Sequence, residues 1–170
     1  SLQAASTSSA NESYVALVSS VTVNETVVSL SPYGVVDIPA NGSAASGAIN
    51  VSGWALDDTQ VARVAVWRKA VPGESSPSGQ MYVGDAVFLE GARPDVANQY
   101  PGAPFNTRAG WGMQVLTNML PNAAGAGPPG NGAHQLFVYA IDVEGRSTLL
   151  GSPAINVNNA SATKPFGTLD

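Results

Sequence analysis

Short runs of alternating apolar and polar residues, separated by glycine, proline and asparagine, cover most of the chain. Alternation with a period of two is typical of β-strands, and the glycine- and proline-rich breaks supply turns. The predicted strands are residues 47–55, 61–67, 81–89, 110–116, 133–143 and 147–157, with an opening strand near Val35 and Val36. The pattern contains no long helix, but Pro94 and Asp95 favour one short helical turn at 94–99. The sequence therefore predicts an all-β protein.

Several of these strands carry apolar side chains on both faces. In strand 61–67, Val61 and Trp67 point to one side, whereas Val64 and Val66 point to the other. A lone sheet would leave one of those faces in water, whereas two sheets packed face to face bury both. About seven strands with this pattern indicate an immunoglobulin-like β-sandwich of two antiparallel sheets.

One short string occurs twice, as PYGVVD at 32–37 and as PFGTLD at 165–170. The distance between the two copies is that of one ordinary domain, which is typical of tandem modules. We therefore predict that residues 1–31 are a linker and the tail of a preceding repeat, with an added strand in 14–30. Residues 32–164 are predicted to be one immunoglobulin-like module, and 165–170 the start of a following repeat.

Composition narrows the class of protein further. Only 11% of the residues are charged, against ~25% in a typical domain, and the polar surface must instead come from uncharged residues. This balance is commoner in exported bacterial proteins, and it predicts an extracellular or cell-surface location. The net charge of −5 and the seven scattered basic residues argue against nucleic acid as a partner. No apolar stretch reaches the ~20 residues that cross a bilayer, so membrane insertion is not expected.

Several short segments together resemble a known family. They are GWALDD at 53–58, VARV at 61–64, RPDVA at 93–97, YP at 100–101, GWG at 110–112, NGAH at 131–134 and AIDVEGR at 140–146. In order and spacing they resemble bacterial immunoglobulin-like domains, which are tandem modules of large secreted or cell-surface proteins. The resemblance covers about residues 33–170 and implies the fold. It implies no activity, because that family is defined by architecture and has no agreed ligand or catalytic residues.

Residue types suited to catalysis are few. His134 is the only histidine, cysteine is absent, and no serine lies in a Gly-x-Ser-x-Gly motif. His134 directly follows a loop and has no orienting partner nearby in the sequence, which favours a structural role. We therefore predict a non-enzymatic chain with no catalytic residues and no cofactor. A hydrolase that uses two carboxylates stays open as a further alternative, because a sequence does not give the distance between them.

Four acidic residues fall on two turns that share one end of an immunoglobulin-like sandwich. Asp57 and Asp58 follow strand 47–55, and Asp142 and Glu144 lie on the last hairpin. Aspartate is a preferred turn former, and turn formation is the interpretation that we adopt, with no metal site assigned. The open alternative is a calcium site, since Ca²⁺ takes six to eight oxygen ligands at about 2.3–2.6 Å.

Five aromatic residues allow two interpretations: Trp54, Trp67, Trp111, Tyr82 and Tyr100. Exposed aromatic faces stack on sugar rings, whereas buried tryptophans supply core volume between sheets. Most of the five alternate with polar neighbours in predicted strands, and we therefore favour the core.

The segment after residue 92 is expected to cap one end of the sandwich. Arg93 has two candidate partners, which are Asp95 nearby and the carboxylates of the last hairpin. Exposed ion pairs contribute only about 0–1 kcal/mol, so packing of Val96 and Tyr100 should hold the segment.

Together these features predict a non-catalytic structural, adhesive or spacer module of a secreted or cell-surface bacterial protein. The alternative is a carbohydrate-binding module attached to an enzyme elsewhere in the polypeptide. The expected partners are neighbouring repeats of the same polypeptide, with surface polysaccharide or protein as further candidates.

Overall fold

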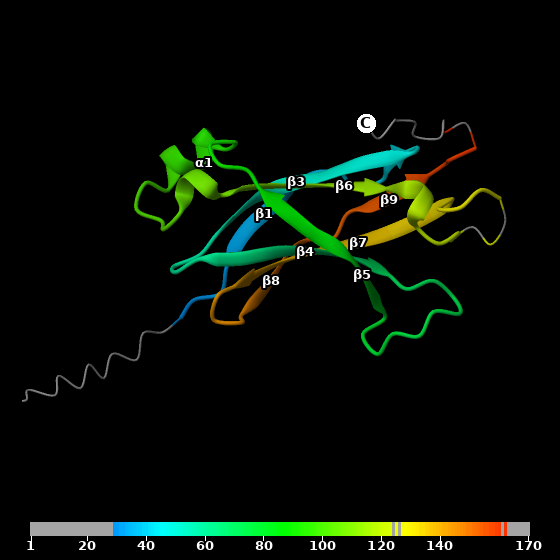
Figure 1. Cartoon of the computed structure of the whole chain (residues 1–170), viewed down its shortest axis with the longest axis horizontal. Coiled ribbons are helices and arrows are strands. Elements are labelled where there is room, and N and C mark those ends of the chain that lie inside the picture. The colour runs from blue at the N-terminus through cyan, green and yellow to red at the C-terminus, as the bar shows by residue number, and fades with distance from the viewer. Residues whose placement is uncertain (1–28, 124, 126, 161, 163–170) are drawn as a thin grey trace, which may run out of the picture.

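The structure is a computed structural model, and it describes residues 29–123, 125, 127–160 and 162 (Figure 1). This part consists mostly of strands, as predicted. The strands are β1 (Tyr33–Ile38), β2 (Ser43–Ala45), β3 (Ala48–Leu56), β4 (Val61–Lys69), β5 (Gln80–Phe88), β6 (Gly110–Leu116), β7 (Gly132–Asp142), β8 (Ser147–Gly151) and β9 (Ala154–Val157). The helical elements are α1 (Pro94–Gln99) and two 3₁₀ turns, η1 (Asn106–Arg108) and η2 (Thr117–Met119).

The nine described strands form one hydrogen-bonded sheet. Its order is β1-β3-β6-β5-β4-β7-β9-β2, and β8 also pairs with β7. Neighbouring strands are antiparallel except β2 and β9, which are parallel. The prediction of about seven strands in two antiparallel sheets is therefore wrong in the number of strands and in the separation of the sheets.

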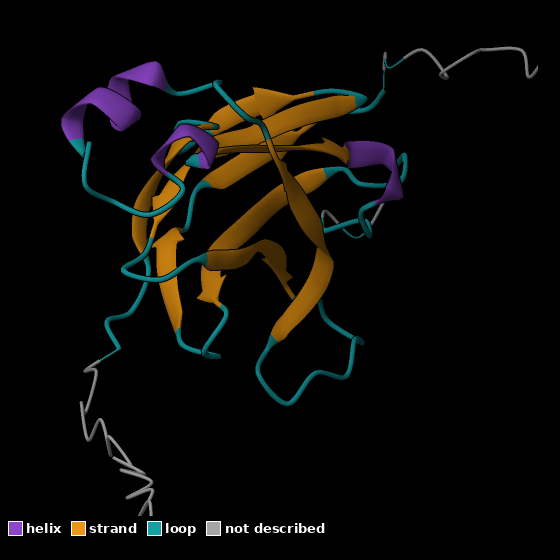
Figure 2. Cartoon of the chain, turned by 60° about the vertical axis from the view of Figure 1, so that its left-hand side comes forward, coloured by secondary structure: helices purple, strands orange, loops and turns teal. Residues whose placement is uncertain are grey.

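Strand β5 joins the two halves of this sheet. Its residues up to Ala86 pair with β4, whereas Val87 and Phe88 pair with β6. The sheet curls there, as Figure 2 shows, and buried residues of β3 and β6 share one core with buried residues of β4 and β7. On the opposite side β1 packs against β8, where Val36 lies against Gly151. One curled sheet thereby buries two facing apolar surfaces, which is what the alternating pattern requires.

The main core lies between the two halves. Its fully buried members include Val51, Trp111 and Val115 on one side and Val64, Val66, Leu136, Val138 and Ala140 on the other. Alternation along β7 is regular, because its even-numbered residues from 134 to 142 are buried and the odd-numbered residues between them are half-buried. Burial of each large aliphatic side chain contributes about 1.5–3 kcal/mol, so this shared interior holds the halves together.

The predicted strand at 147–157 is two strands in the structure. β8 pairs with residues 138–141 of β7, whereas β9 pairs with residues 132–135 of the same strand. Pro153 lies between them and has no amide hydrogen with which to continue a ladder. Its carbonyl accepts a hydrogen bond from the Leu136 amide at 3.0 Å. Strand β2 adds the ninth, and its three residues are too few to show a period.

Helix α1 begins at Pro94, as predicted, and caps one end of the sheet. Buried Val96 packs with Leu56 and Ala109 in a second apolar cluster, and Tyr100 packs against that cluster. The expected packing of this segment is therefore confirmed. The turns η1 and η2 were not predicted from the sequence, because a helical turn of three residues leaves no detectable pattern.

The described chain begins and finishes at opposite ends of the long axis of the molecule (Figure 1). Residues 29–31 precede β1 at one end, and residues 158–160 follow β9 at the other. Residues 29 and 30 are not in a strand, and the rest of the strand predicted in 14–30 lies outside the described residues. The predicted following repeat at 165–170 also lies outside them. Within the described part, no helix is long and apolar enough to cross a membrane.

Candidate functional site

Asp57 closes the turn between β3 and β4. Its Oδ2 accepts hydrogen bonds from the Thr59 amide at 3.0 Å, the Thr59 hydroxyl at 2.7 Å and the Gln60 amide at 3.1 Å. This is the local turn-supporting role expected of aspartate. The side chain is only 2% exposed, and its Oδ1 has no hydrogen-bond partner among the described residues. The turn therefore uses one carboxylate oxygen and leaves the other one free.

Asp142 plays the same part at the hairpin between β7 and β8. Its Oδ1 accepts hydrogen bonds from the Glu144 and Arg146 amides, both at 2.8 Å. Gly145 has a φ of 88°, which glycine adopts without steric cost and which allows the tight turn of this hairpin. Asp142 is also 2% exposed, and within the described structure its Oδ2 has no partner.

Strand pairing brings these two turns together. Val61, the first residue of β4, is paired with Asp142, and the Val143 amide donates to the Gln60 carbonyl at 3.1 Å. One carboxylate oxygen from each of Asp57, Asp142 and Glu144 lies within 4.8 Å of those of the other two. We call these three residues the acidic cluster. The predicted meeting of the two turns is therefore correct for three of the four acidic residues.

Asp58 is not part of the acidic cluster. It is exposed, and its Oδ2 accepts a hydrogen bond from the Leu30 amide at 3.2 Å. Glu144, the exposed member of the cluster, accepts a hydrogen bond from the Ser29 hydroxyl. The acidic residues therefore also contact the segment that leads into β1, a role that the sequence did not indicate.

The acidic cluster has no cationic side chain to balance it among the described residues. Four ion pairs occur in this part of the chain, and none includes Asp57, Asp142 or Glu144. A buried carboxylate without a counter-charge is costly, because the interior replaces water poorly as a solvent for charge. Two such carboxylates within reach of each other raise that cost through repulsion.

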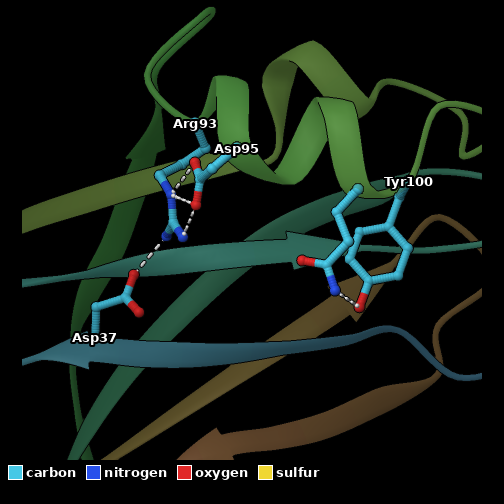
Figure 3. Close-up of polar contacts among 5 residues, drawn as sticks. Asp37, Arg93, Asp95 and Tyr100 are labelled. Carbon is cyan, nitrogen blue, oxygen red and sulfur yellow. Dashed lines mark hydrogen bonds and ion pairs between the residues drawn. The ribbon is translucent and has the colours of Figure 1, made fainter.

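Arg93 balances a different group of carboxylates near α1. Figure 3 shows its guanidinium between Asp37 of β1 and Asp95 of α1, and its Nη2 lies 2.7 Å from Asp95 Oδ2. Hydrogen bonds from this guanidinium lower the pKa of Asp95 to about 2. The predicted pairing with Asp95 is thus correct. The alternative pairing with the hairpin carboxylates is wrong, because β1 supplies the second partner.

Arg68 and Glu74 form another compensated pair at the base of the long loop after β4. Arg68 is 9% exposed, and its Nη1 donates to Glu74 Oε2 at 2.6 Å. The Val71 amide donates to the same oxygen at 2.8 Å. The hydrogen bond from Arg68 makes the largest contribution to lowering the pKa of Glu74 to about 2, and that from Val71 makes the second largest. Both arginine sites contrast with the acidic cluster, for which the described residues supply no cationic side chain.

The aromatic residues divide between the interior and the surface. Trp111 is buried in the main core, as favoured from the sequence. Trp54 is half-buried and contacts Tyr33 and Tyr100, with ring centroids 6.0 and 5.6 Å away. These three rings pack against one another between β1 and α1.

A second aromatic group lies on the outer side of β4, β5 and β7. Trp67 contacts Tyr82 edge to face at a centroid distance of 5.2 Å. The Gln80 side chain donates to the Tyr139 hydroxyl at 3.1 Å, and an open groove runs along Trp67, Gln80, Tyr139 and Arg63. Tyr82 is 49% exposed. We call Trp67, Tyr82 and Tyr139 the aromatic face.

His134 is 3% exposed, and its Nε2 lies 2.8 Å from the Gly130 carbonyl. The ring therefore ties the long loop before β7 to the sheet, in line with the structural role that the sequence favours.

Asn159 organises the end of the module where the chain leaves. Its Oδ1 accepts hydrogen bonds from the Gly47 amide and the Thr117 hydroxyl, both at 2.8 Å. Its Nδ2 donates to the Pro129 carbonyl at 2.8 Å, and its amide donates to Asn131 Oδ1 at 2.7 Å. We call Thr117, Asn131 and Asn159 the amide cluster. Sequence reasoning missed it, because its members are far apart in the chain and belong to no motif.

Comparisons with known proteins assign no family. No protein-family model matches the chain, and no curated protein sequence matches it. Its fold is similar to that of fibronectin(III)-like modules of Clostridium thermocellum CbhA, at 15% identity and a TM-score of 0.45, over 82% of this chain and 53% of that one. A cycloalternan-degrading enzyme from Trueperella pyogenes, in complex with cycloalternan, is similar at 13% identity and a TM-score of 0.35, over 69% of this chain and 14% of that one.

The chain thus spans about half or less of the structures that it matches. Likenesses this remote indicate neither a family nor an activity. The resemblance to bacterial immunoglobulin-like domains is supported only as far as a β-rich architecture, which the nine strands establish directly.

Proposed function

We propose that this chain is a non-catalytic module that spaces neighbouring units of a secreted or cell-surface bacterial protein. The observation that carries the proposal is the position of residues 29–31 and 158–160 at opposite ends of the long axis (Figure 1). Units connected in this way can follow one another in series, each in contact only with its neighbours. The low content of charged residues supports an exported location.

The repeated string supports a serial arrangement as well. In its first copy, Pro32 is fully buried and the residues from Tyr33 to Asp37 lie in β1. The string therefore supplies the first strand of the module. A near-copy at 165–170 is what the first strand of a next unit requires.

Burial argues against Asp57 and Asp142 as the carboxylate pair of the hydrolase that the sequence left open. A glycosidase needs two carboxyl groups that both reach the scissile bond of a sugar. Asp57 and Asp142 are each 2% exposed, and each commits one oxygen to its own turn. A sugar ring has no access to both.

Solution scattering tests the spacer function. Two copies of residues 29–162 joined in series should give a maximum dimension close to twice that of one copy, because the connections leave from opposite ends. A single copy measured under the same conditions is the control. A compact, folded-back pair would contradict the proposal.

The aromatic face favours a second candidate function, which is binding of polysaccharide. Trp67, Tyr82 and Tyr139 lie on three adjacent strands, with polar Gln80 and Arg63 beside them. Stacking of rings with neighbouring hydrogen-bonding groups is the chemistry that recognises sugars. Binding of this kind is compatible with a spacer, since the aromatic face lies on the side of the module.

Retention on insoluble polysaccharide tests this second function. The whole chain should sediment with the polymer, and Tyr82→Ala should abolish retention, because Tyr82 is the most exposed ring of the aromatic face. Phe105→Ala removes a ring of similar exposure elsewhere and should leave retention unchanged. Equal retention of both variants would reject the aromatic face as the binding surface.

A further inference from the structure

Two buried carboxylate oxygens are left without partners at the end of the module where the described chain begins. Asp57 Oδ1 and Asp142 Oδ2 have no hydrogen-bond partner in the described structure, although both side chains are 98% buried. Buried polar atoms are nearly always satisfied, and an exception indicates strain or a missing ligand. The opposite oxygen of each carboxylate is fixed by its turn, so the free oxygens are held in place.

The spacing of the acidic cluster fits one ion. Oxygen atoms of Asp57, Asp142 and Glu144 lie within 4.8 Å of one another. Two ligands of the same calcium ion, each at about 2.4 Å, are at most about twice that distance apart. The three oxygens therefore lie close enough to contact a single ion with little movement of the backbone.

The donor atoms select the kind of metal. The acidic cluster offers only carboxylate oxygens, and neither histidine nor cysteine belongs to it. Hard oxygen donors suit calcium and magnesium, whereas zinc and copper favour imidazole and thiolate ligands. Magnesium requires near-ideal octahedral geometry and keeps several waters, while calcium accepts irregular sites and bidentate carboxylates. Two fixed buried oxygens and one adaptable exposed carboxylate match calcium better.

We propose that Asp57, Asp142 and Glu144 bind one Ca²⁺ ion, with water completing its coordination. The ion supplies the positive charge that the described side chains do not provide at this place. Coordination through Asp57 Oδ1 and Asp142 Oδ2 gives each of these free oxygens a partner, and the charge of the ion offsets the repulsion within the acidic cluster.

The site also reaches the segment that leads into the module. Ser29 donates to Glu144, and the Leu30 amide donates to the neighbouring Asp58. An ion that fixes Glu144 therefore also fixes residues 29–31 against the end of the sheet. Calcium would in this way stiffen the connection to a preceding unit, a consequence that rests on the proposed spacer function, whereas binding of the ion does not.

Calcium titration of the whole chain tests the binding. After removal of metal with a chelator, calorimetry should detect one ion per chain, and the Tm should rise by roughly 5–10 °C at saturation. About 10 mM Ca²⁺ is sufficient, because extracellular calcium modules bind with Kd values of ~10⁻⁴–10⁻³ M. Magnesium at the same concentration should raise the Tm less. No binding heat and no change in Tm with calcium would overturn the proposal.

Two substitutions separate a ligand from a turn former. Asp142→Asn keeps an oxygen for the Glu144 and Arg146 amides but removes the charge. Glu144→Gln likewise removes the charge of an exposed side chain and keeps an oxygen for Ser29. Each should weaken the Kd at least ~10-fold. Glu90→Gln removes an exposed charge elsewhere and should bind calcium like the parent chain. Unchanged affinity in both cluster variants would also overturn the proposal.

Cleavage by chymotrypsin after exposed Leu30 tests the stiffening separately. Calcium should slow this cleavage several-fold in the parent chain and leave it unchanged in Glu144→Gln, with the products identified by mass. If calcium binds but does not slow cleavage, the metal site stands and its effect on the connection is rejected.

Discussion

The two ends of the module place polar groups in the interior by opposite means. At the end where the chain leaves, Asn159 has a partner for its amide and for both atoms of its side-chain amide group. At the end where the described chain begins, Asp57 and Asp142 each satisfy one oxygen and leave one without a partner in the described structure. The amide cluster is complete within the described protein, whereas the acidic cluster is complete only with a cation.

The largest effect should come from making the amide cluster resemble the acidic one. Asn159→Asp keeps the acceptor for Gly47 and Thr117 but turns a carboxylate oxygen toward the Pro129 carbonyl, 2.8 Å from the present nitrogen. Loss of that hydrogen bond and burial of a charge should lower the free energy of unfolding by about 2–4 kcal/mol. Urea denaturation measures this, with the same exchange at exposed Asn98, Asn98→Asp, as the control, which should change stability by less than ~0.5 kcal/mol.

A smaller effect should show that apolar packing, and not charge, holds the structure around α1. Tyr100→Ala removes a half-buried ring from the cluster of Val96 and should cost about 2 kcal/mol. Arg93→Ala removes the ion pairs with Asp37 and Asp95 and should cost about 1 kcal/mol or less. In a denaturant titration, the unfolding midpoint of Tyr100→Ala should therefore lie at a lower denaturant concentration than that of Arg93→Ala. A more damaging Arg93 substitution would show that charge pairing dominates there.

The reverse exchange at the acidic cluster should stabilise the protein when metal is absent. With a chelator present, Asp142→Asn removes one of two neighbouring buried charges and keeps the turn, so the free energy of unfolding should rise by about 1 kcal/mol. A Tm measured with and without chelator checks this. A loss of stability in both conditions would mean that Asp142 acts through its turn alone, and the contrast between the two ends would disappear.

The smallest effect concerns a carboxylate that the protein balances itself. Because the pKa of Glu74 is about 2 in the folded state and lies near 4.5 in its ordinary range, the charged pair with Arg68 stabilises the fold fully above about pH 4.5. That contribution should be lost as the pH falls from about 4.5 to 2. Denaturation at several acid pH values should therefore show a shallower decline for Glu74→Gln. An identical decline in both proteins would exclude Glu74 as a contributor.

Much of the fold was predictable, since alternation of apolar residues located β3, β4, β5, β6 and β7 to within two residues at either end. The closure of the sheet was not. It depends on the last two residues of β5 changing partner from β4 to β6, and no pattern within β5 marks that change. The sequence shows a proline at 153, but a break of two residues within one apolar run does not reveal that the segments before and after it are separate strands.

The acidic cluster was half predictable. Turn chemistry at Asp57 and Asp142 followed from residue type, and the shared end of the two turns followed from the expected topology. The free oxygens depend on the direction of each side chain, which a sequence does not contain. Ser29 contacts Glu144, and Leu30 contacts Asp58. These residues are far apart in the chain, so the sequence does not indicate that they meet.

Parallel pairing of β2 with β9 has a mechanical consequence. The described chain enters the module at one end, passes through β1 to β2, and leaves after β9 at the other end, so a pull on both connections slides β2 along β9. The register pairs from Ser43 with Ile155 to Ala45 with Val157 then carry the force at the same time, and they do not peel apart one by one. We expect the pairing of β1 with β3 and this short parallel pair together to set the force at which the module begins to unfold.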